Sequence, residues 1–419
     1  MKIFIFVLFF MALNLGVHSQ SSLDIQTCYA LAEENYPLTK QREVIRSSKE
    51  FFQENLRRSQ WPQLIVAGQA TYQSEVTQLP IQLPGQDIQV LSKDQYRLYG
   101  EISQALYQGG LIRYQKEAEE ARALSEEQGL EAELYKLKGQ INQLYFGLLL
   151  VDEQLKQLEL LKADIQLGIK KAEAGVAGGV AFQSGVDLLM AERLKAEQKN
   201  IELRAMRRVF MDRLGMFIHQ ELSDGVVFEI PPSLPLSDDM HRPEVIHFQS
   251  LRRTLGVHEK ILQTKTLPRL SLFFQGGMGR PALNMLSNAF EPYYLGGLRL
   301  SWNFAAFYTL KNEKSLNRLN QRKIDIQEET FLFQTHFNLL QQDVELEKWN
   351  QLLLSDDEII ALREKIKKAT LAQLENGVIG SSDYLREVYA EDLARQDKSI
   401  HLIQKLLTQY NRGAILGSP

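Results

Sequence analysis

The chain has 419 residues, and 48 lysine and arginine residues against 52 aspartate and glutamate residues give it a formal net charge of −4. This near-neutral balance lacks the basic patch that binding to nucleic acid or to an anionic membrane surface requires. With 44% hydrophobic residues and a mean hydropathy of −0.25, the chain is also too polar for a bundle of membrane-spanning helices. These values exclude a polytopic inner-membrane transporter.

The first 19 residues have the pattern of a signal peptide. Lys2 precedes an apolar run from Ile3 to Leu13, and the small-residue pattern Val17-His18-Ser19 stands before Gln20. The apolar run is too short to span a bilayer. We therefore predict export with cleavage near Ser19, with a buried N-terminal strand as the alternative.

Cys28 is the one cysteine of the chain, so no intrachain disulfide can form. The preceding Ile25-Gln26-Thr27 lacks the small residues of a lipoprotein signal. Cys28 is predicted to be a small apolar residue on a helix face. Beyond the leader no run of 18 apolar residues remains, so any membrane insertion is expected to be by strands.

Two segments of the first half alternate between apolar and polar residues with a period of two. A helix is predicted over residues 23–60, with a break near Pro37, and Trp61-Pro62 ends it. In residues 63–73 the even positions are apolar or glycine, and residues 95–106 repeat this alternation. Both segments are therefore predicted strands.

Long helices are indicated by two proline-free blocks, from Pro84 to Pro231 and from Pro292 to Pro419. A helix over residues 111–175 would be roughly 100 Å long. Glycines at 175, 178, 179 and 185 mark its reversal, so residues 111–217 are predicted to form a long helical hairpin. Inside it, apolar residues recur at alternating spacings of four and three, which predicts a coiled-coil seam. The seam consists of Leu130, Leu134, Leu137, Ile141, Leu144, Leu148, Val151, Leu155 and Leu158.

The second half repeats the pattern of the first. An irregular, proline-rich linker over residues 218–243 separates predicted repeat 1 (20–217) from predicted repeat 2 (244–419). Repeat 2 contains predicted strands at about 269–279 and 293–304 and a helical hairpin at about 305–412. Three landmarks correspond at nearly constant offsets, which indicates a tandem duplication. They pair Pro268 with Pro62, Ser301 with Ser103, and Asp383 with Asp187.

Each repeat supplies only two strands, and open strand edges are not tolerated in lipid. Four strands do not close a barrel, so we expect several chains to contribute, and a trimer would give 12 strands. Apolar residues would cover the outer face, namely Leu64, Val66, Ala70, Tyr72, Leu98, Ile102, Leu270, Leu272, Phe274, Leu298, Leu300 and Trp302. Polar residues would line the lumen, namely Gln69, Thr71, Arg97, Glu101, Ser103, Arg269, Ser271, Gln275, Arg299, Ser301 and Asn303. The energetic cost of arginine side chains facing hydrocarbon would be prohibitive, so the face that carries the arginines is predicted to face water. The alternative is a soluble sandwich.

Over essentially the whole mature chain, the arrangement resembles the outer-membrane efflux proteins, the TolC-type channels. The resemblance rests on the opening Leu23–Pro37, on Ile102–Gly110 and on the Gly-x5-Asp-x-Leu pattern of Gly377, Asp383 and Leu385. It implies a mixed α and β membrane protein, with a trimeric 12-stranded outer-membrane β-barrel continued by a periplasmic α-helical coiled-coil barrel. The linker would belong to the equatorial belt of that tunnel.

The resemblance also implies a function and partners. The chain would be the passive outer-membrane exit duct of a tripartite efflux or type I secretion system in a Gram-negative bacterium. Its partners would be two further copies, outer-membrane lipid, a periplasmic adaptor (membrane fusion) protein and an inner-membrane pump of the RND, ABC or MFS type. The cargo would be small toxic molecules or proteins. The competing hypothesis is a periplasmic coiled-coil scaffold without a pore.

The resemblance places the channel entrance at the hairpin tips. Gly175 and Gly377 match the tip glycines, and Asp187 and Asp383 match the acid that follows. We expect Asp383, with Asp187 in support, to face the pore, and a helix N-cap or first-turn acid is the alternative. The tip residues expected to contact the adaptor are Gly175, Gly377, Val378 and Ser381.

Two departures from the family pattern affect this expectation. Arg386 stands one turn after Asp383, where the family has a second acid. It is therefore a third candidate residue of the channel entrance, and it would pair with Asp383. The first tip also carries about six extra residues between Gly175 and Asp187. Among the lumen residues, Arg97, Glu101, Arg269 and Arg299 are the charged candidates.

No other chemistry is indicated. His241, His247 and His258 have spacings that match no standard metal cluster. Gly276-Gly277-Met278-Gly279 lies in a predicted strand and not at a strand-to-helix phosphate loop. No nucleophile with a plausible base stands out, so neither an enzyme nor a cofactor is expected.

Overall fold

The computed structural model describes residues 22–77, 90–235 and 237–417. The predicted signal peptide therefore lies outside the described residues. The first half contains β1 (Ser22–Leu23), α1 (Ile25–Asn35), a 3-10 turn (Pro37–Lys40), α2 (Gln41–Arg58), β2 (Gln63–Tyr72), β3 (Asp94–Tyr107), α3 (Leu111–Tyr135), α4 (Leu137–Ala177) and α5 (Gln183–Ile218). The second half contains β4 (Val227–Phe228), α6 (Pro243–Thr264), β5 (Arg269–Arg280), β6 (Glu291–Ser301), α7 (Ala306–Glu375) and α8 (Ser381–Leu416).

The described residues fall into two compact units, and each unit draws segments from both halves of the sequence. We call the first the hairpin unit; it comprises the described residues up to Thr39, then Glu133–Arg242, and those from Gln334 onward. We call the second the sheet unit; it comprises Lys40–Ala132 and Pro243–Phe333. Because both units combine the two halves, the division into tandem repeats stays a prediction.

The sheet unit holds a four-stranded antiparallel sheet in the order β2-β3-β5-β6. Leu64 pairs with Ile102, and Ile102 pairs with Phe274, so these apolar residues share one face. At Gly277 a Cβ atom would lie only 2.3 Å from the carbonyl oxygen of Leu98, so this close approach requires glycine. β6 ends at Ser301, before the expected residue 304, because Asn303 accepts a hydrogen bond from the Ala305 amide (3.1 Å) just before α7 begins.

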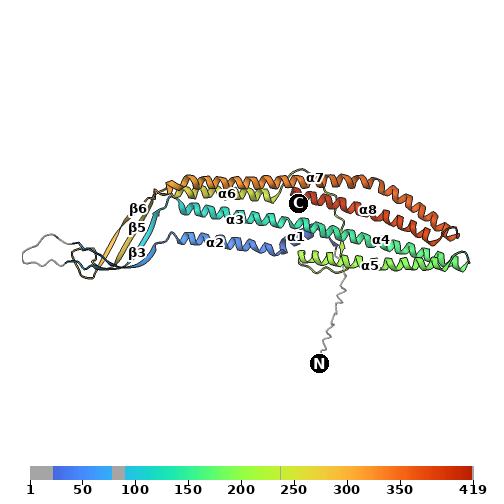
Figure 1. The fold of residues 1–419 in the computed structure, drawn as a ribbon, viewed down its shortest axis with the longest axis horizontal. Helices are drawn as coiled ribbons and strands as arrows, with labels where there is room; N and C mark the ends of the chain where they lie inside the picture. Colours follow the sequence, from blue (N-terminus) through green and yellow to red (C-terminus); the bar gives the residue numbers. More distant parts are fainter. Residues whose placement is uncertain (1–21, 78–89, 236, 418–419) are drawn as a thin grey trace, which may run out of the picture. The chain divides into compact units, whose positions relative to one another are not determined.

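Two helical hairpins, α4–α5 and α7–α8, run side by side in the hairpin unit (Figure 1). Within the described residues, the seam predicted from the heptads is buried or half-buried throughout, and Leu148 is fully buried. The predicted continuous helix is interrupted once, at Lys136, which keeps near-helical angles (φ −62°, ψ −22°). Burial of one apolar stripe thus holds the long helices against each other.

A short parallel pairing of β1 with β4 ties the linker to the start of the described chain. The Tyr145 hydroxyl lies 2.8 Å from the carbonyl oxygen of Leu23 and 2.7 Å from that of Glu229, so it holds both segments to α4. Cys28 is fully buried on α1, as predicted, and burial raises the pKa of its thiol to about 12. In the described part of the chain no helix combines the length and apolarity needed to cross a membrane.

Candidate functional site

Each helical hairpin reverses through a glycine in the left-handed conformation. Gly179 (φ +74°) follows α4, and Gly377 (φ +68°) follows α7. At the first tip the amide of Val180 donates to the carbonyl of Gly175 (2.9 Å), and at the second the amide of Val378 donates to that of Gln373 (2.9 Å). These bonds are typical of Schellman caps, in which the following glycine avoids a Cβ clash.

This geometry corrects the sequence-based matching of the tips. Gly175 lies inside α4, so it is Gly179 that takes the place of Gly377. α5 begins four residues after Gly179, and α8 begins four residues after Gly377. The two turns therefore have equal length, and the expected six extra residues at the first tip are not an insertion in the turn.

The two tips touch each other. A Cβ atom on Gly377 would lie 3.5 Å from the Cβ of Val180, and one on Gly185 would lie 2.7 Å from the Ser381 hydroxyl oxygen. Ser381 is consequently buried, at 8% exposure. Val180, Phe182 and Val378 are instead 63%, 85% and 71% exposed. We call these three residues the tip patch, an apolar surface at the end of the hairpin unit.

The acidic candidates differ in their surroundings. Asp383 lies in the first turn of α8, and its carboxylate is 3.6 Å from the Arg386 guanidinium, which also pairs with Glu387 (3.1 Å). The expected pairing of Asp383 with Arg386 is therefore present. Asp187 lies in the second turn of α5, is exposed and accepts a hydrogen bond from Gln183 (3.0 Å). With Gly179 as the tip glycine, Asp187 and Asp383 do not occupy equivalent positions.

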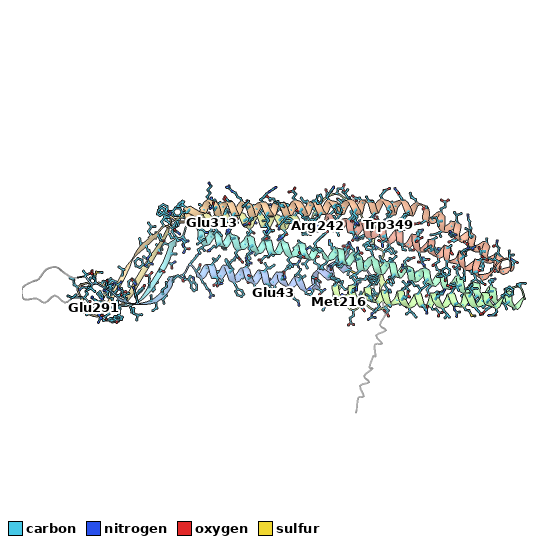
Figure 2. The ribbon with its side chains drawn as sticks, in the orientation of Figure 1. Glu43, Met216, Arg242, Glu291, Glu313 and Trp349 are labelled. Carbon is cyan, nitrogen blue, oxygen red and sulfur yellow. The ribbon has the colours of Figure 1, made fainter. Side chains whose placement is uncertain are left out.

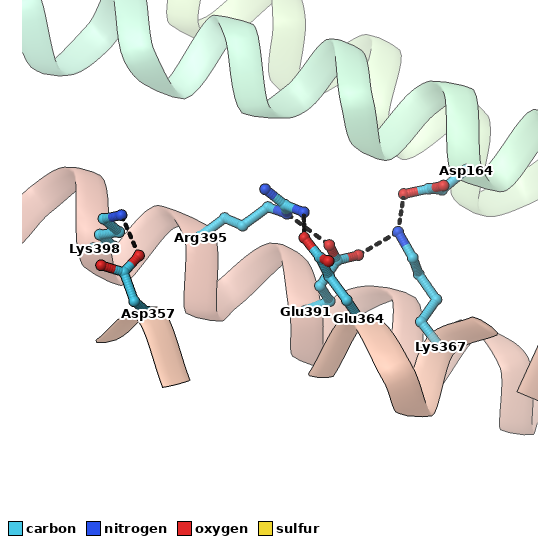
Figure 3. Close-up of polar contacts among 7 residues, drawn as sticks. All are labelled: Asp164, Asp357, Glu364, Lys367, Glu391, Arg395 and Lys398. Carbon is cyan, nitrogen blue, oxygen red and sulfur yellow. Dashed lines mark hydrogen bonds and ion pairs between the residues drawn. The ribbon is translucent and has the colours of Figure 1, made fainter. Parts of the chain in front are cut away.

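A charged network that the sequence analysis missed joins the hairpins (Figure 3). Lys367 of α7 pairs with Asp164 of α4 (2.8 Å) and with Glu391 of α8. Arg395 of α8 pairs with Glu391 (2.6 Å) and with Glu364 of α7. The Glu391 side chain is only 3% exposed, and its ion pairs with the two cations compensate its buried charge.

The pKa values in this network shift in opposite directions. Burial alone would raise the pKa of Glu391, but hydrogen bonds from Lys367 and Arg395 hold it below its usual value. The side chain of the neighbouring Asp392 accepts its hydrogen bond from the neutral amide of Gln396 (2.7 Å). Burial raises the pKa of Asp392 to about 6. Asp392 is therefore a carboxyl group that titrates near neutral pH.

An aromatic side chain closes the same contact between hairpins. The Tyr384 hydroxyl of α8 donates to the carbonyl oxygen of Asp164 on α4 (3.1 Å), and the side chain is 1% exposed. A Cβ atom on Gly168 would lie 2.6 Å from its ring. Gly168 thus provides the space that lets α8 pack closely against α4.

In the sheet unit, the charged candidates for the lumen lie on one face. Arg299 of β6 reaches across β5 to pair with Glu101 of β3 (2.8 Å), and its guanidinium lies 4.3 Å from the ring centre of Phe273. Arg97 and Arg269 are exposed on the same face, toward opposite ends of the sheet. Phe273 is an aromatic residue on the face predicted to be polar, where it packs under Arg299.

No metal centre is formed by the part of the chain that the structure describes, because no three His, Cys, Asp or Glu side chains gather there. His247 lies with Nδ1 3.0 Å from the carbonyl oxygen of Ser125. Its ring also packs where a side chain on Gly129 would stand (3.0 Å). These contacts give His247 a packing role between α3 and α6.

Known structures share this fold, although the sequence matches no protein-family model and no curated protein. The outer-membrane protein VceC from Vibrio cholerae is 12% identical, with a TM-score of 0.67 over 94% of this chain and 96% of its own. The CmeC outer-membrane channel of Campylobacter jejuni is 13% identical, with a TM-score of 0.65 over 94% and 85%. The MtrE outer-membrane channel of Neisseria gonorrhoeae in its open state is 13% identical, with a TM-score of 0.64 over 94% and 89%.

These likenesses define the class of fold. The chain has the mixed α and β fold, with long helices, of these outer-membrane proteins and channels. The resemblance expected from the sequence is thereby confirmed at the level of the fold.

Proposed function

We propose that this protein is a passive outer-membrane exit duct of a Gram-negative bacterium. Three chains would close a 12-stranded barrel, and their helices would continue it as a tunnel through the periplasm. The four-stranded sheet carries this proposal, because one of its faces is apolar and exposed and neither edge strand has a second neighbour among the described residues. The channels that share the fold are outer-membrane proteins, which supports this location.

The exposed face of the sheet has the composition expected for contact with lipid. Large apolar side chains with 44–75% exposure stand on it, among them Leu64, Val66, Tyr96, Leu98, Ile102, Leu272, Phe274, Tyr294, Leu298 and Leu300. The opposite face carries Arg97, Glu101, Arg269 and Arg299. A soluble sandwich would cover the apolar face with a second sheet, and the described residues of the sheet unit contain none.

The sheet edges explain why one chain would not suffice. Within the part of the chain that the structure describes, β2 and β6 each have one neighbouring strand. A backbone edge exposed to hydrocarbon leaves its N–H and C=O groups without partners, at a cost of several kcal/mol for each group. Pairing β2 of one copy with β6 of the next would satisfy these groups and would close the ring after three copies.

The tips of the hairpin unit would form the entrance and would dock a periplasmic adaptor. The apolar tip patch supports this role, because an exposed cluster of this kind indicates a protein contact. Of the expected adaptor contacts, Val378 is exposed, whereas Ser381 is buried and Gly175 lies inside α4. The adaptor would connect the duct to an inner-membrane pump of a tripartite efflux or type I secretion system, which would supply the energy.

The proposed entrance is tested by single-channel recording in planar bilayers. The purified protein is expected to conduct in discrete steps. If Asp383 faces the pore, Asp383→Ala changes conductance and cation preference more than Asp187→Ala does. Unchanged values in Asp383→Ala would refute the gate assignment. A folded trimer that never conducts would refute the duct.

The long buried heptad seam also suits a second candidate, a periplasmic coiled-coil scaffold without a pore. Extraction separates the two candidates, because a duct remains in the membrane fraction until detergent releases it. A scaffold is released with the soluble periplasm. The exposed apolar face of the sheet favours the duct.

A further inference from the structure

A groove lies where the polar face of the sheet meets the beginning of α7. Its volume is about 490 Å³, and the residues that line it belong to the sheet unit. Arg269, the first residue of β5, and Ser301, the last residue of β6, are register partners and stand on the polar face. We call this hollow the junction groove; its polar lining consists of Lys265, Arg269, Ser301, Asn303 and Thr309.

Contacts between side chains and backbone hold the groove in shape. The indole nitrogen of Trp302 donates to the carbonyl oxygen of Thr266 (2.9 Å), which ties the turn between α6 and β5 to the end of β6. In the same turn, the Lys265 ammonium lies 2.9 Å from the Glu313 carboxylate of α7. That carboxylate also accepts a hydrogen bond from the Thr309 hydroxyl (3.2 Å). The groove is therefore formed before any ligand arrives, which lowers the cost of binding.

The polar face of the sheet carries a net positive charge. Arg299 pairs with Glu101 across β5 (2.8 Å). Arg97 and Glu291 are both register partners of Gly279, so they share one row across the sheet. The described strands place three arginines and two glutamates on this face, a charge of 3 − 2 = +1 per chain, namely Arg97, Arg269, Arg299, Glu101 and Glu291. Two of the arginines are thus matched by the two glutamates.

Arg269 is the arginine that remains unmatched. Its side chain is exposed and has no ion-pair partner among the described residues. Glu291 lies at the other end of the sheet from Glu313 (Figure 2), and Glu313 is already paired with Lys265. At the groove, the charges of Lys265, Arg269 and Glu313 therefore sum to 1 + 1 − 1 = +1. One singly charged anion would neutralise this sum.

We infer that the junction groove binds the oxyanion group of anionic cargo, a phosphate or a carboxylate, with Arg269 as its main ligand. A guanidinium group presents parallel N–H donors whose spacing matches two oxygens of such a group. The Ser301 hydroxyl and the Asn303 amide group add neutral donors. The side-chain oxygen of Asn303 already accepts from the Ala305 amide (3.1 Å), so its NH₂ group is the part left for a ligand.

This inference rests on the proposed duct, because only in a closed barrel does the polar face line a lumen. Three copies would then place three grooves around the base of the barrel, and a ring of cationic side chains favours anions in a pore. A phospholipid headgroup offers the same chemistry as a phosphate on cargo. Arg269 and Ser301 stand on the face opposite the exposed apolar one, which favours cargo over lipid.

Single-channel recording tests the site on full-length protein in neutral phosphatidylcholine bilayers. Inorganic phosphate is the probe, and KCl keeps the ionic strength constant. Phosphate is expected to reduce the conductance of the unsubstituted protein. In Arg269→Gln the phosphate concentration for half reduction should rise by about tenfold, because a charge-assisted contact is lost. Arg97→Gln is the matched control, since it removes the same charge from the same face near the opposite end of the sheet.

Two results would overturn the inference and leave the proposed function standing. One is conductance that phosphate does not reduce, and the other is an equal shift in Arg269→Gln and Arg97→Gln. Native mass spectrometry of the same preparations separates cargo from lipid. If the unsubstituted trimer retains a phospholipid that Arg269→Gln loses, a headgroup occupies the groove and the assignment to cargo is wrong.

A folded trimer that never conducts would overturn the proposed function, and calorimetric titration of that trimer with phosphate in detergent then decides the site. Binding heat that Arg269→Gln abolishes and Arg97→Gln keeps would support an oxyanion site. Absence of heat in the unsubstituted protein would overturn it. The failure of the duct and the failure of the site are therefore distinguishable.

Discussion

Gly179 and Gly377 determine where the two hairpins reverse. Both hold positive φ angles in Schellman caps, where a side chain would strain the backbone. At Gly179 no atom lies within 4 Å of the place that a Cβ would occupy, so the expected cost of a substitution is conformational and not steric. The backbone angle alone thus accounts for the glycine at this tip.

We predict that Gly179→Ala lowers the free energy of unfolding by about 1 kcal/mol, because an L-residue in the left-handed region costs that much. Gly139 supplies the matched control. It lies within α4, and no atom lies within 4 Å of its Cβ position. Gly139→Ala should therefore raise stability by about 0.5–1 kcal/mol. Thermal unfolding followed by the helical circular-dichroism signal measures both, and equal effects of the two substitutions would contradict the assignment.

Asp392 makes the hairpin unit sensitive to pH. Its pKa is raised by burial from 3.8 to about 6, so the folded state binds a proton more tightly than the unfolded state does. The side chain therefore adds no penalty below about pH 4, and its penalty grows as pH rises from about 4 to about 6 and stays constant above that. We predict that Asp392→Asn stabilises the protein by about 1–2 kcal/mol at pH 7.5 and by far less at pH 4. Denaturant unfolding at both pH values measures the difference, and a pH-independent gain would show that Asp392 does not titrate in this range.

At the scale of elements, α4 offers two leucines that differ in burial. Leu148 is fully buried on the heptad seam, and Leu160 is 52% exposed. We predict that Leu148→Ala costs about 3 kcal/mol, because it leaves a cavity between packed helices. Leu160→Ala should cost less than about 0.5 kcal/mol. Equilibrium unfolding of the two variants compares them, and similar costs would mean that the seam does not hold the hairpin unit together.

The elements themselves follow closely from periodicity. Period-two alternation predicts all four strands to within about three residues of their ends, because one face of each strand is apolar and the other polar. Periodicity does not predict where the first hairpin reverses, since four glycines lie from residue 175 to residue 185. Hydrogen bonding across the turn, and not composition, selects Gly179.

The network around Glu391 is also hidden from the sequence. Asp164, Lys367 and Glu391 each resemble a solvated charge on a helix surface when the helices are considered one at a time. Only the packing of α4 against α7 and α8 brings the three together and buries Glu391. The spacing of residues within one helix therefore cannot predict this network, because its members lie on three helices.

At the scale of the whole molecule, the proposed outer-membrane barrel predicts that membrane insertion depends on which face of the sheet a residue occupies. Phe274 is 52% exposed on the apolar face, and the next residue, Gln275, lies on the other face and pairs with Glu101. We predict that Phe274→Lys costs about 2–4 kcal/mol in the membrane and depletes the protein from the outer-membrane fraction. Gln275→Lys should be tolerated, because a lysine there lies opposite a glutamate. Equal membrane yields for the two variants would contradict the assignment of the faces.

The equal turns at Gly179 and Gly377 limit how the chain can change in length. Each glycine stands 76 residues after a matching serine, Ser103 or Ser301. The strand connections, in contrast, differ in length. The connection between β2 and β3 has 21 residues, whereas the connection between β5 and β6 has 10. The two halves therefore differ in length in their strand connections and not in the spacing from strand end to hairpin tip. One residue deleted from a helix arm rotates everything beyond it by about 100° and withdraws the tip by about 1.5 Å. Viable shortening of the hairpins is therefore expected only in blocks of seven residues removed from all four arms together.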